Sequence, residues 1–249
     1  GTLWNFFPNT SLNAVDFFRP VENRKPQLNR NQFGFAPGGP VLRNRTFFFV
    51  DYEGYREVTS QVQFANLPYQ NFRNGIIGPG ALPGGANYLL RNPFTGAIHG
   101  NGIIPQSDTP PYARRVFAEL PPPASAASPL VNNYSRLVRV TNYRDKGDGK
   151  LDHNFPGRLR GFLRYSRSRA DLFDEGAIPG IAGGGGNGST RIPLGQAIGG
   201  VTWVLDPASL LEFRAGFSRS EAGKSPVLAG GASMQELLGV PGLPTDRRF

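Results

Sequence analysis

The stretch RLRGFLRYSR, residues 158–167, alternates between two kinds of side chain with a period of two. From 159 to 165, leucine, glycine and tyrosine occupy the odd positions, while arginine recurs at the even ones. A period of two places alternate residues on opposite faces of a β-strand. Such a strand fits a soluble sandwich, whose apolar face meets a core, or a membrane barrel, whose apolar face meets lipid.

Seven stretches have the alternation and the residue types expected of strands. They are residues 1–7, 31–38, 46–57, 148–155, 158–167, 196–205 and 209–219. The last of these alternates completely, with Leu211 and Phe213 on one face and Glu212 and Arg214 on the other. Glycine and proline are spread throughout the chain, so long helices are not expected.

The links between these strands are alternately short and long. The short links are 39–45, 156–157 and 206–208, and the long ones are 8–30, 58–146, 168–195 and 220–249. Antiparallel order places all short turns at one end of the sheet and all long loops at the other. Outer-membrane barrels sort their connections in this way, and strands of about ten residues match a tilted membrane crossing. We therefore expect an all-β fold, an antiparallel transmembrane β-barrel segment that forms an open curved sheet in isolation.

The composition excludes several classes of protein. The chain has no cysteine, so neither a disulfide framework nor a thiolate metal site is expected. It has no apolar run of about 18 residues and therefore no transmembrane helix, but barrel strands are short and only half apolar. The formal charge of +9 comes from lysines and arginines scattered along the chain, so we expect no nucleic-acid partner.

The long links carry most of the unusual composition. Residues 75–102 are dense in Gly, Pro and Asn, and 178–191 are a low-complexity stretch. Two short helices are predicted, one over 111–120 before a run of prolines and one in the stretch 233–242 that ends at Gly239. The link 58–146 is too long to be a simple connector, so we expect it to cap the barrel or to bind a ligand.

The residues that could carry chemistry do not form a known catalytic pattern. No glycine-rich or aspartate-rich stretch satisfies the phosphate-loop or calcium-loop spacing. The only histidines, His99 and His153, are far apart in the chain, so we expect no metal site and no catalytic triad. Asp51 and Glu53 share one strand face, where they could act as acid and base but are expected to pair with arginines. We expect no enzymatic activity and no cofactor.

Residues 28–57, LNRNQFGFAPGGPVLRNRTFFFVDYEGYRE, resemble the signature run near the start of the barrel in Oar-like TonB-dependent outer-membrane receptors. The matching residues are Arg30-Asn31-Gln32-Phe33-Gly34, Gly38-Gly39-Pro40, Arg45-Thr46-Phe47-Phe48-Phe49 and Asp51-Tyr52-Glu53-Gly54. Residues 92–108 resemble the family's first large outer loop, and 150–168 and 202–220 resemble its next two hairpins. Pro37 and Pro8 depart from the family pattern, and Pro37 indicates a bulge or an early strand end.

This resemblance implies a part of a large barrel, typically of about 22 strands. Residues 1–249 are expected to be a partial TonB-dependent receptor barrel, from which the plug and the N-terminal regulatory-like domain are absent. The implied function is energised uptake of a scarce, unidentified ligand across a Gram-negative outer membrane. The implied partners are outer-membrane lipid, the protein's own plug and remaining barrel strands, and the TonB complex through the missing N-terminal region.

The barrel interpretation assigns each strand residue to one of two environments. Residues expected to face the lumen are Asp51, Glu53, Arg158, Arg160, Arg164, Glu212 and Arg214. Residues expected to face lipid are Phe48, Val50, Tyr52, Leu159, Leu163, Tyr165, Leu211, Phe213 and Phe217. Candidate ligand contacts in the long loops are Tyr88, Arg91, Tyr112, Arg114 and Arg115. The aromatics Tyr52, Tyr165 and Phe217 are expected near the long-loop ends of their strands, and Trp203 near a short turn.

A second hypothesis is a soluble, secreted β-rich adhesion or glycan-binding module. In that case the apolar faces would bury one another, and the protein would be soluble without detergent. A third hypothesis is a hydrolase that uses Asp51 and Glu53, for which loss of activity on replacing both would be the evidence.

Overall fold

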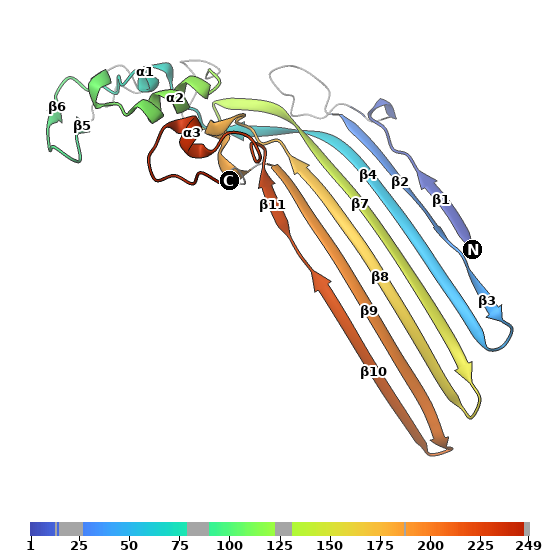
Figure 1. The fold of residues 1–249 in the computed structure, drawn as a ribbon. Helices are drawn as coiled ribbons and strands as arrows, with labels where there is room; N and C mark the ends of the chain where they lie inside the picture. The colour runs from blue at the N-terminus through green and yellow to red at the C-terminus, as the bar shows by residue number, and fades with distance from the viewer. Residues whose placement is uncertain (13, 15–26, 79–89, 123–130, 187, 247–249) are drawn as a thin grey trace.

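A computed structural model describes residues 1–12, 14, 27–78, 90–122, 131–186 and 188–246. One large antiparallel sheet dominates it, with neighbouring strands in the order β1-β2-β4-β7-β8-β9-β10 (Figure 1). Two further strands extend the sheet, because β3 pairs with β4 and β11 pairs with β9. The strands of this sheet are β1 (Thr2–Phe6), β2 (Leu28–Ala36), β3 (Gly38–Leu42), β4 (Thr46–Ala65), β7 (Tyr134–Phe155), β8 (Leu159–Asp174), β9 (Gly188–Asp206), β10 (Ser209–Ser220) and β11 (Gly223–Pro226).

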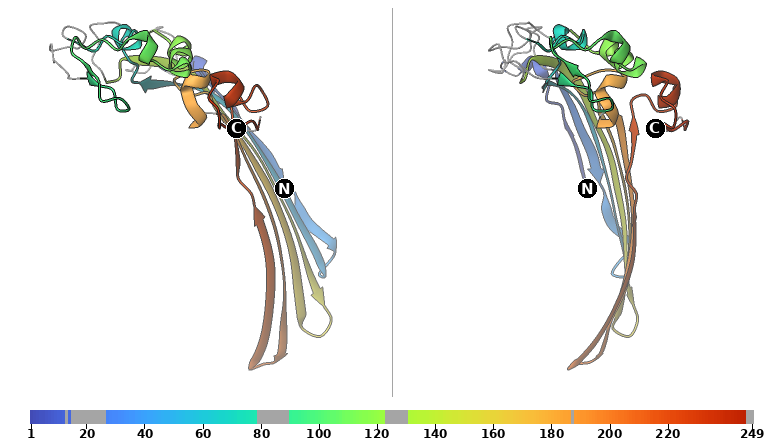
Figure 2. Two further views of the ribbon diagram at one scale, coloured as in Figure 1. Left: turned by 60° about the vertical axis from the view of Figure 1, so that its left-hand side comes forward. Right: turned by 90° about the vertical axis from the view of Figure 1, so that its left-hand side faces the viewer.

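The short turns gather at one end of the sheet and the longer connections at the other. The small elements lie at the long-connection end, beside the upper ends of the strands (Figure 1). They are α1 (Gln70–Arg73), β5 (Leu90–Arg91), β6 (Ile98–His99), α2 (Pro111–Glu119) and α3 (Met234–Leu238), with 3-10 turns at Thr10–Leu12, Gln106–Asp108 and Ile181–Gly186. The sheet is curved rather than flat (Figure 2). The expected open antiparallel barrel segment is therefore confirmed.

Both predicted helices form, and local signals define their ends. The hydroxyl of Ser233 accepts a hydrogen bond from the Glu236 amide, and the Glu236 carboxylate accepts one from the Ser233 amide. This capping box starts α3. Gly239 ends it with a φ of 67°, a left-handed conformation that glycine adopts at no steric cost. Pro111 starts α2, because the first turn of a helix does not need its amide hydrogen.

The central strands are much longer than the sequence predicts. β4 has 20 residues, β7 has 22, β8 has 16 and β9 has 19, where strands of about ten were expected. The link expected over 58–146 is therefore confined to 66–133. The added segments, such as 134–147 of β7, are mostly polar, and their few apolar residues fall on both faces, so they lack the apolar alternation that identifies a half-buried strand.

Two strand boundaries reflect backbone restrictions. β2 ends at Ala36, immediately before Pro37, and β3 resumes the pairing with β4 at Gly38. Phe35 lies opposite Tyr52 and Gly38 opposite Phe49, so the interruption adds no residue and is not a bulge. Arg158 was expected in a strand, but it lies in the turn before β8 with a φ of 63°. It is therefore not part of the strand row of arginines.

The described residues contain almost no hydrophobic core. Their buried hydrophobic side chains are only Leu67, Tyr69 and Val138. The apolar residues of the strands instead remain exposed on one face of the sheet. Burial of apolar side chains against one another therefore does not hold this sheet together, and the strand pairing carries most of its order.

Candidate functional site

The strand register collects the apolar side chains on one face of the sheet, which we call the apolar face. Leu159 lies opposite Trp203, and Trp203 lies opposite Leu211. The same ladder places Leu163 opposite Leu151 and Val201 opposite Phe213. All nine residues expected to face lipid lie on this face: Phe48, Val50, Tyr52, Leu159, Leu163, Tyr165, Leu211, Phe213 and Phe217.

Side chains on the apolar face are so exposed that their contact with water would be unfavourable. Phe213 is 65% exposed and Phe217 is 69% exposed, and both belong to one continuous apolar surface. An apolar hollow of about 500 Å³ lies on this face over Gly161 and Gly199, because glycine has no side chain to fill the space. Soluble monomers rarely expose a contiguous apolar patch of more than a few hundred Å². The arrangement requires an apolar medium or a partner against this face.

The opposite face, the polar face, carries a ladder of ion pairs. The carboxylate of Asp148 is nearly buried, and it lies 2.7 Å from Arg164 Nη2 and 3.3 Å from Lys146 Nζ. Ser166 also donates a hydrogen bond to Asp148. Lys150 Nζ lies 2.8 Å from Asp152 Oδ1 on the same strand. Several charged side chains of this face thus bond to one another, and Lys150 also lies over the ring of Phe162.

Asp51 and Glu53 lie on the polar face, but the arginine pairs expected for them do not form. Asp51 is opposite Asp148, and Glu53 is opposite Lys146. The Gln32 amide donates a 3.3 Å hydrogen bond to Glu53. Arg164, which lies on the same face, bonds to Asp148 instead, because this diagonal neighbour is within reach of its long side chain.

The other residues expected to face the lumen also lie on the polar face, except for Arg158 in its turn. Arg160 and Arg164 share it in β8, and Glu212 and Arg214 share it in β10. Arg214 Nη2 lies 2.5 Å from Glu212 Oε1, so this pair forms along one strand rather than between two. These strand residues therefore share one face of the sheet.

Sequence reasoning missed a set of charges on the same side as the apolar face. Toward the long-connection end of the sheet, past Tyr52, Tyr165 and Phe217, many positions on this side carry charged residues in place of apolar ones. The arginines at these positions, called here the arginine row, are Arg56, Arg167, Arg169, Arg191 and Arg219. Because the row follows the apolar band along the same strands, the apolar face ends partway along the sheet.

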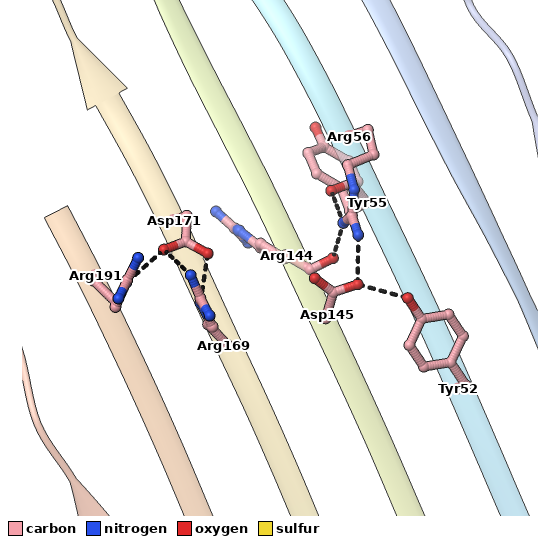
Figure 3. A network of polar contacts seen from close by, with 8 residues as sticks. All are labelled: Tyr52, Tyr55, Arg56, Arg144, Asp145, Arg169, Asp171 and Arg191. Atoms are coloured by element: carbon pink, nitrogen blue, oxygen red, sulfur yellow. Dashed lines mark hydrogen bonds and ion pairs between the residues drawn. The ribbon is translucent and has the colours of Figure 1, made fainter. Parts of the chain in front are cut away.

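Hydrogen bonds connect the arginine row to neighbouring strands (Figure 3). Tyr52 donates a 2.5 Å hydrogen bond to Asp145, whose carboxylate also lies 2.6 Å from Arg56 Nη2. Asp171 lies 2.6 Å from Arg169 Nε and 3.0 Å from Arg191 Nε. These bonds cross from β4 to β7 and from β8 to β9, so they tie together the parts of the strands beyond the apolar band.

The aromatic residues mark the edges of the apolar band rather than the strand ends. Tyr165 and Phe217 lie on either side of Ala197 in the ladder. Tyr165 was expected near the long-loop end, but β8 continues to Asp174. Trp203 lies near the short turn, as expected, because β9 ends at Asp206. Phe217 also lies near the long-loop end, as expected, because β10 ends at Ser220, whereas the positions expected for Tyr52 and Tyr165 were wrong, since β4 and β8 are longer than predicted.

The candidate ligand residues of the long loop are only partly placed. Tyr88 lies outside the described residues. Arg91 is in β5, while Tyr112, Arg114 and Arg115 are on α2, and all four are exposed. Arg115 Nη1 donates a 3.2 Å hydrogen bond to the Leu237 carbonyl, which joins α2 to α3. Among the described residues, no hydrogen bond or ion pair connects Arg91 to α2.

Two polar side chains hold this loop region in place, and no sequence pattern pointed to either of them. The Asn133 side chain accepts a 2.7 Å hydrogen bond from the Leu67 amide and donates one of 2.7 Å to the Leu67 carbonyl. The Arg73 guanidinium donates to the carbonyls of Leu120 and Pro121. Partial burial lowers the pKa of Arg73. An arginine guanidinium nevertheless stays protonated in proteins.

Each of the two histidines has a local partner. His153 Nδ1 lies 2.8 Å from Thr46 Oγ1, and its ring packs against Phe155. His99 Nε2 lies 3.6 Å from Asp108 Oδ2 in the loop region. Within the described part of the chain, no three His, Cys, Asp or Glu residues form a group able to hold a metal ion. No helix in that part is long and apolar enough to span a membrane.

One exposed apolar face, one ion-paired face and sorted connections define the wall of an outer-membrane β-barrel. The chain belongs to the family described as an outer membrane beta barrel domain, whose model matches residues 1–249. No curated protein and no solved structure matches the chain. The protein is therefore an outer-membrane barrel protein of Gram-negative bacteria. A soluble adhesion module does not fit, because the apolar face is not buried against a second sheet.

Proposed function

We propose that the chain forms part of the barrel wall of a TonB-dependent transporter, which takes up a scarce ligand across the outer membrane with energy from the inner membrane. The observation that carries this proposal is the division of the sheet into one exposed apolar face and one ion-paired face. In the proposed orientation, the apolar face lies against lipid and the polar face lines the lumen. The chain contributes no covalent chemistry.

The energetics of the two faces support this orientation. An arginine on the lipid side at mid-membrane costs about 2–4 kcal/mol, whereas the lumen of a large barrel contains water. The polar face carries Arg160, Arg164 and Arg214, and the apolar band carries no lysine or arginine at its positions in β8 and β10. Only one orientation therefore avoids the penalty.

The edges of the sheet favour a large barrel over a small one. The described sheet does not close, because β1 lies at one edge and β10 at the other. All twelve residues of β10 are exposed. An unpaired edge in a membrane leaves backbone amides and carbonyls without partners, so further strands must cover it. A barrel that contains this sheet as one sector has room for a plug.

Two further features support TonB-dependent uptake in particular. Residues 28–57 carry the signature that resembles Oar-like receptors. The link 66–133 is also far longer than a connector and contains its own helices and hairpin at the long-loop end. A large structured outer loop is suited to capture of a ligand before transport. Peptides, glycans and metal chelates are the classes to test.

Uptake by the intact protein tests this function. Cells that express it are supplied with labelled oligopeptides, oligosaccharides or ferric chelates, with and without a functional TonB complex. Accumulation of one class that is lost without TonB supports the proposal. Accumulation that is equal in both strains identifies a passive pore and contradicts energised uptake. The matched control is a strain that lacks the protein.

A further inference from the structure

The side of the sheet proposed to face lipid carries a second pattern just beyond the apolar band. In the ladder across β8, β9 and β10, the rings of Tyr165 and Phe217 flank the small residue Ala197. Two residues further along each strand, Arg167 and Arg219 flank Gly195 in the same way. Across the three strands, one row therefore has a small residue between two aromatic rings, and the next row has a glycine between two arginines.

These residues form a groove of about 410 Å³. Its lining includes Tyr165, Arg167, Gly195, Phe217 and Arg219. Adjacent strands in a sheet lie about 4.8 Å apart. Arg167 and Arg219 are on β8 and β10, with β9 and its Gly195 between them, so the two arginines start about 10 Å apart. A Cβ atom on Gly195 would meet nothing within 4 Å, so the space above this residue is open. The groove is thus open in the middle, with Arg167 at one side and Arg219, beside Glu221, at the other.

The charges of this region favour an anion. The arginine row contributes five guanidinium groups, and the carboxylates bonded to it are Asp145, Asp171 and Glu221. In the groove itself, Arg219 pairs with Glu221, whereas Arg167 has no hydrogen bond or ion pair among the described residues. The groove therefore retains a net positive charge, and guanidinium groups bind phosphate oxygens in a bidentate manner.

We propose that this groove binds the phosphorylated headgroup of an outer-leaflet glycolipid. This inference rests on the proposed orientation of the apolar face toward lipid. The ligand places a phosphate between Arg167 and Arg219, while its sugar and the first part of its acyl chains contact Tyr165 and Phe217. A lipid fits better than a free anion, because the groove opens directly onto the apolar band, which an acyl chain can follow.

Binding to purified protein tests the proposal. The intact protein is extracted from outer membranes in a maltoside detergent and titrated with bisphosphorylated lipid A, with bound lipid counted by native mass spectrometry. Dephosphorylated lipid A and inorganic phosphate are titrated in parallel. The variants are R167Q/R219Q, which removes both charges, and G195V, which fills the groove without changing the charge. The second variant adds a residue type that strands favour.

The matched control is R160Q/R214Q on the polar face. Arg160 has no ion pair among the described residues, as Arg167 has none, and Arg214 pairs with a carboxylate two residues away, as Arg219 does. We expect R167Q/R219Q and G195V each to weaken lipid A binding by about tenfold or more, and the control to leave it unchanged. Dephosphorylated lipid A is expected to bind the wild-type protein as weakly as lipid A binds R167Q/R219Q.

Two results overturn the proposal while leaving the transporter function intact. In one, the variants reach the outer membrane and bind lipid A as tightly as the wild-type protein does. In the other, inorganic phosphate binds as tightly as lipid A, which identifies a site for a free anion. Failure of the wild-type protein to reach the outer membrane, by contrast, overturns both this inference and the proposed function.

Discussion

At the residue scale, the cost of a charge depends on the face that carries it. Leu163 on the apolar face and Leu210 on the polar face are both leucines of similar exposure, 59% and 62%. We expect Leu163→Arg to lower the free energy of unfolding in detergent or lipid by about 2–4 kcal/mol, and Leu210→Arg to change it by less than about 1 kcal/mol. Urea unfolding in vesicles measures both. Equal losses would contradict the assignment of the faces.

Asp148 has the most connected carboxylate of the polar face. Replacing it by alanine leaves Lys146 and Arg164 without the charge that separates them, and leaves Ser166 without its acceptor. We expect Asp148→Ala to destabilise the protein by about 1–3 kcal/mol. Asp152→Ala is the control, because that carboxylate is 42% exposed and pairs only with Lys150. Its loss is expected below about 1 kcal/mol, and an equal or larger loss would argue against a special role for Asp148.

At the element scale, β10 offers a direct test of the alternation. The chain has no native cysteine, so a single introduced cysteine carries a spin label at a defined place. We expect a label at Phe213→Cys to collide with oxygen, which concentrates in lipid, and a label at Arg214→Cys to collide with a water-soluble nickel complex. Power-saturation measurements on the protein in vesicles give both collision rates. The reverse order would place the polar face in lipid.

The two ends of the loop region 66–133 are held together through Asn133. Asn133→Ala removes two hydrogen bonds to the Leu67 backbone in a nearly fully buried site. We expect proteolysis within 66–133 to become about 5–30 times faster, which corresponds to about 1–2 kcal/mol of local stability. The strands are expected to remain resistant. Asn154→Ala at the short-turn end is the control and is expected to leave the cleavage rate unchanged.

The sequence predicted elements well where one face is apolar and poorly where both faces are polar. The alternation of 209–219 gave β10 and its two faces, since lipid-facing and lumen-facing residues differ in kind. The segment 134–147 gave no such signal, because its few apolar residues fall on both faces, and only pairing with β4 and β8 shows that it is a strand. The arginine row was missed because it lies beyond the apolar band, where apolar and polar residues no longer alternate. The partner of Asp148 depends on a diagonal contact that linear spacing does not define.

At the scale of the whole molecule, the unpaired edges and the exposed apolar face determine how the chain behaves by itself. We expect residues 1–249, expressed with a periplasm-targeting signal, to appear only in outer membranes or in aggregates that detergent extracts. Fractionation with and without detergent measures this. A monodisperse monomer in plain buffer would require the apolar faces to be buried, which contradicts the exposed sheet described above.

The length of the strands beyond the apolar band has a consequence for where a ligand is first met. The segment of β7 from Asp145 to Tyr134 extends for about 40 Å along the strand, or about 30 Å in height at the tilt usual for barrels. In the proposed orientation this part of the barrel wall extends beyond the membrane surface into the sugar coat of the cell. Its mouth, with α1, α2 and α3, stands well above the lipid. If the protein takes up a ligand as proposed, we expect that ligand to be bound in open water, before it has crossed the sugar coat.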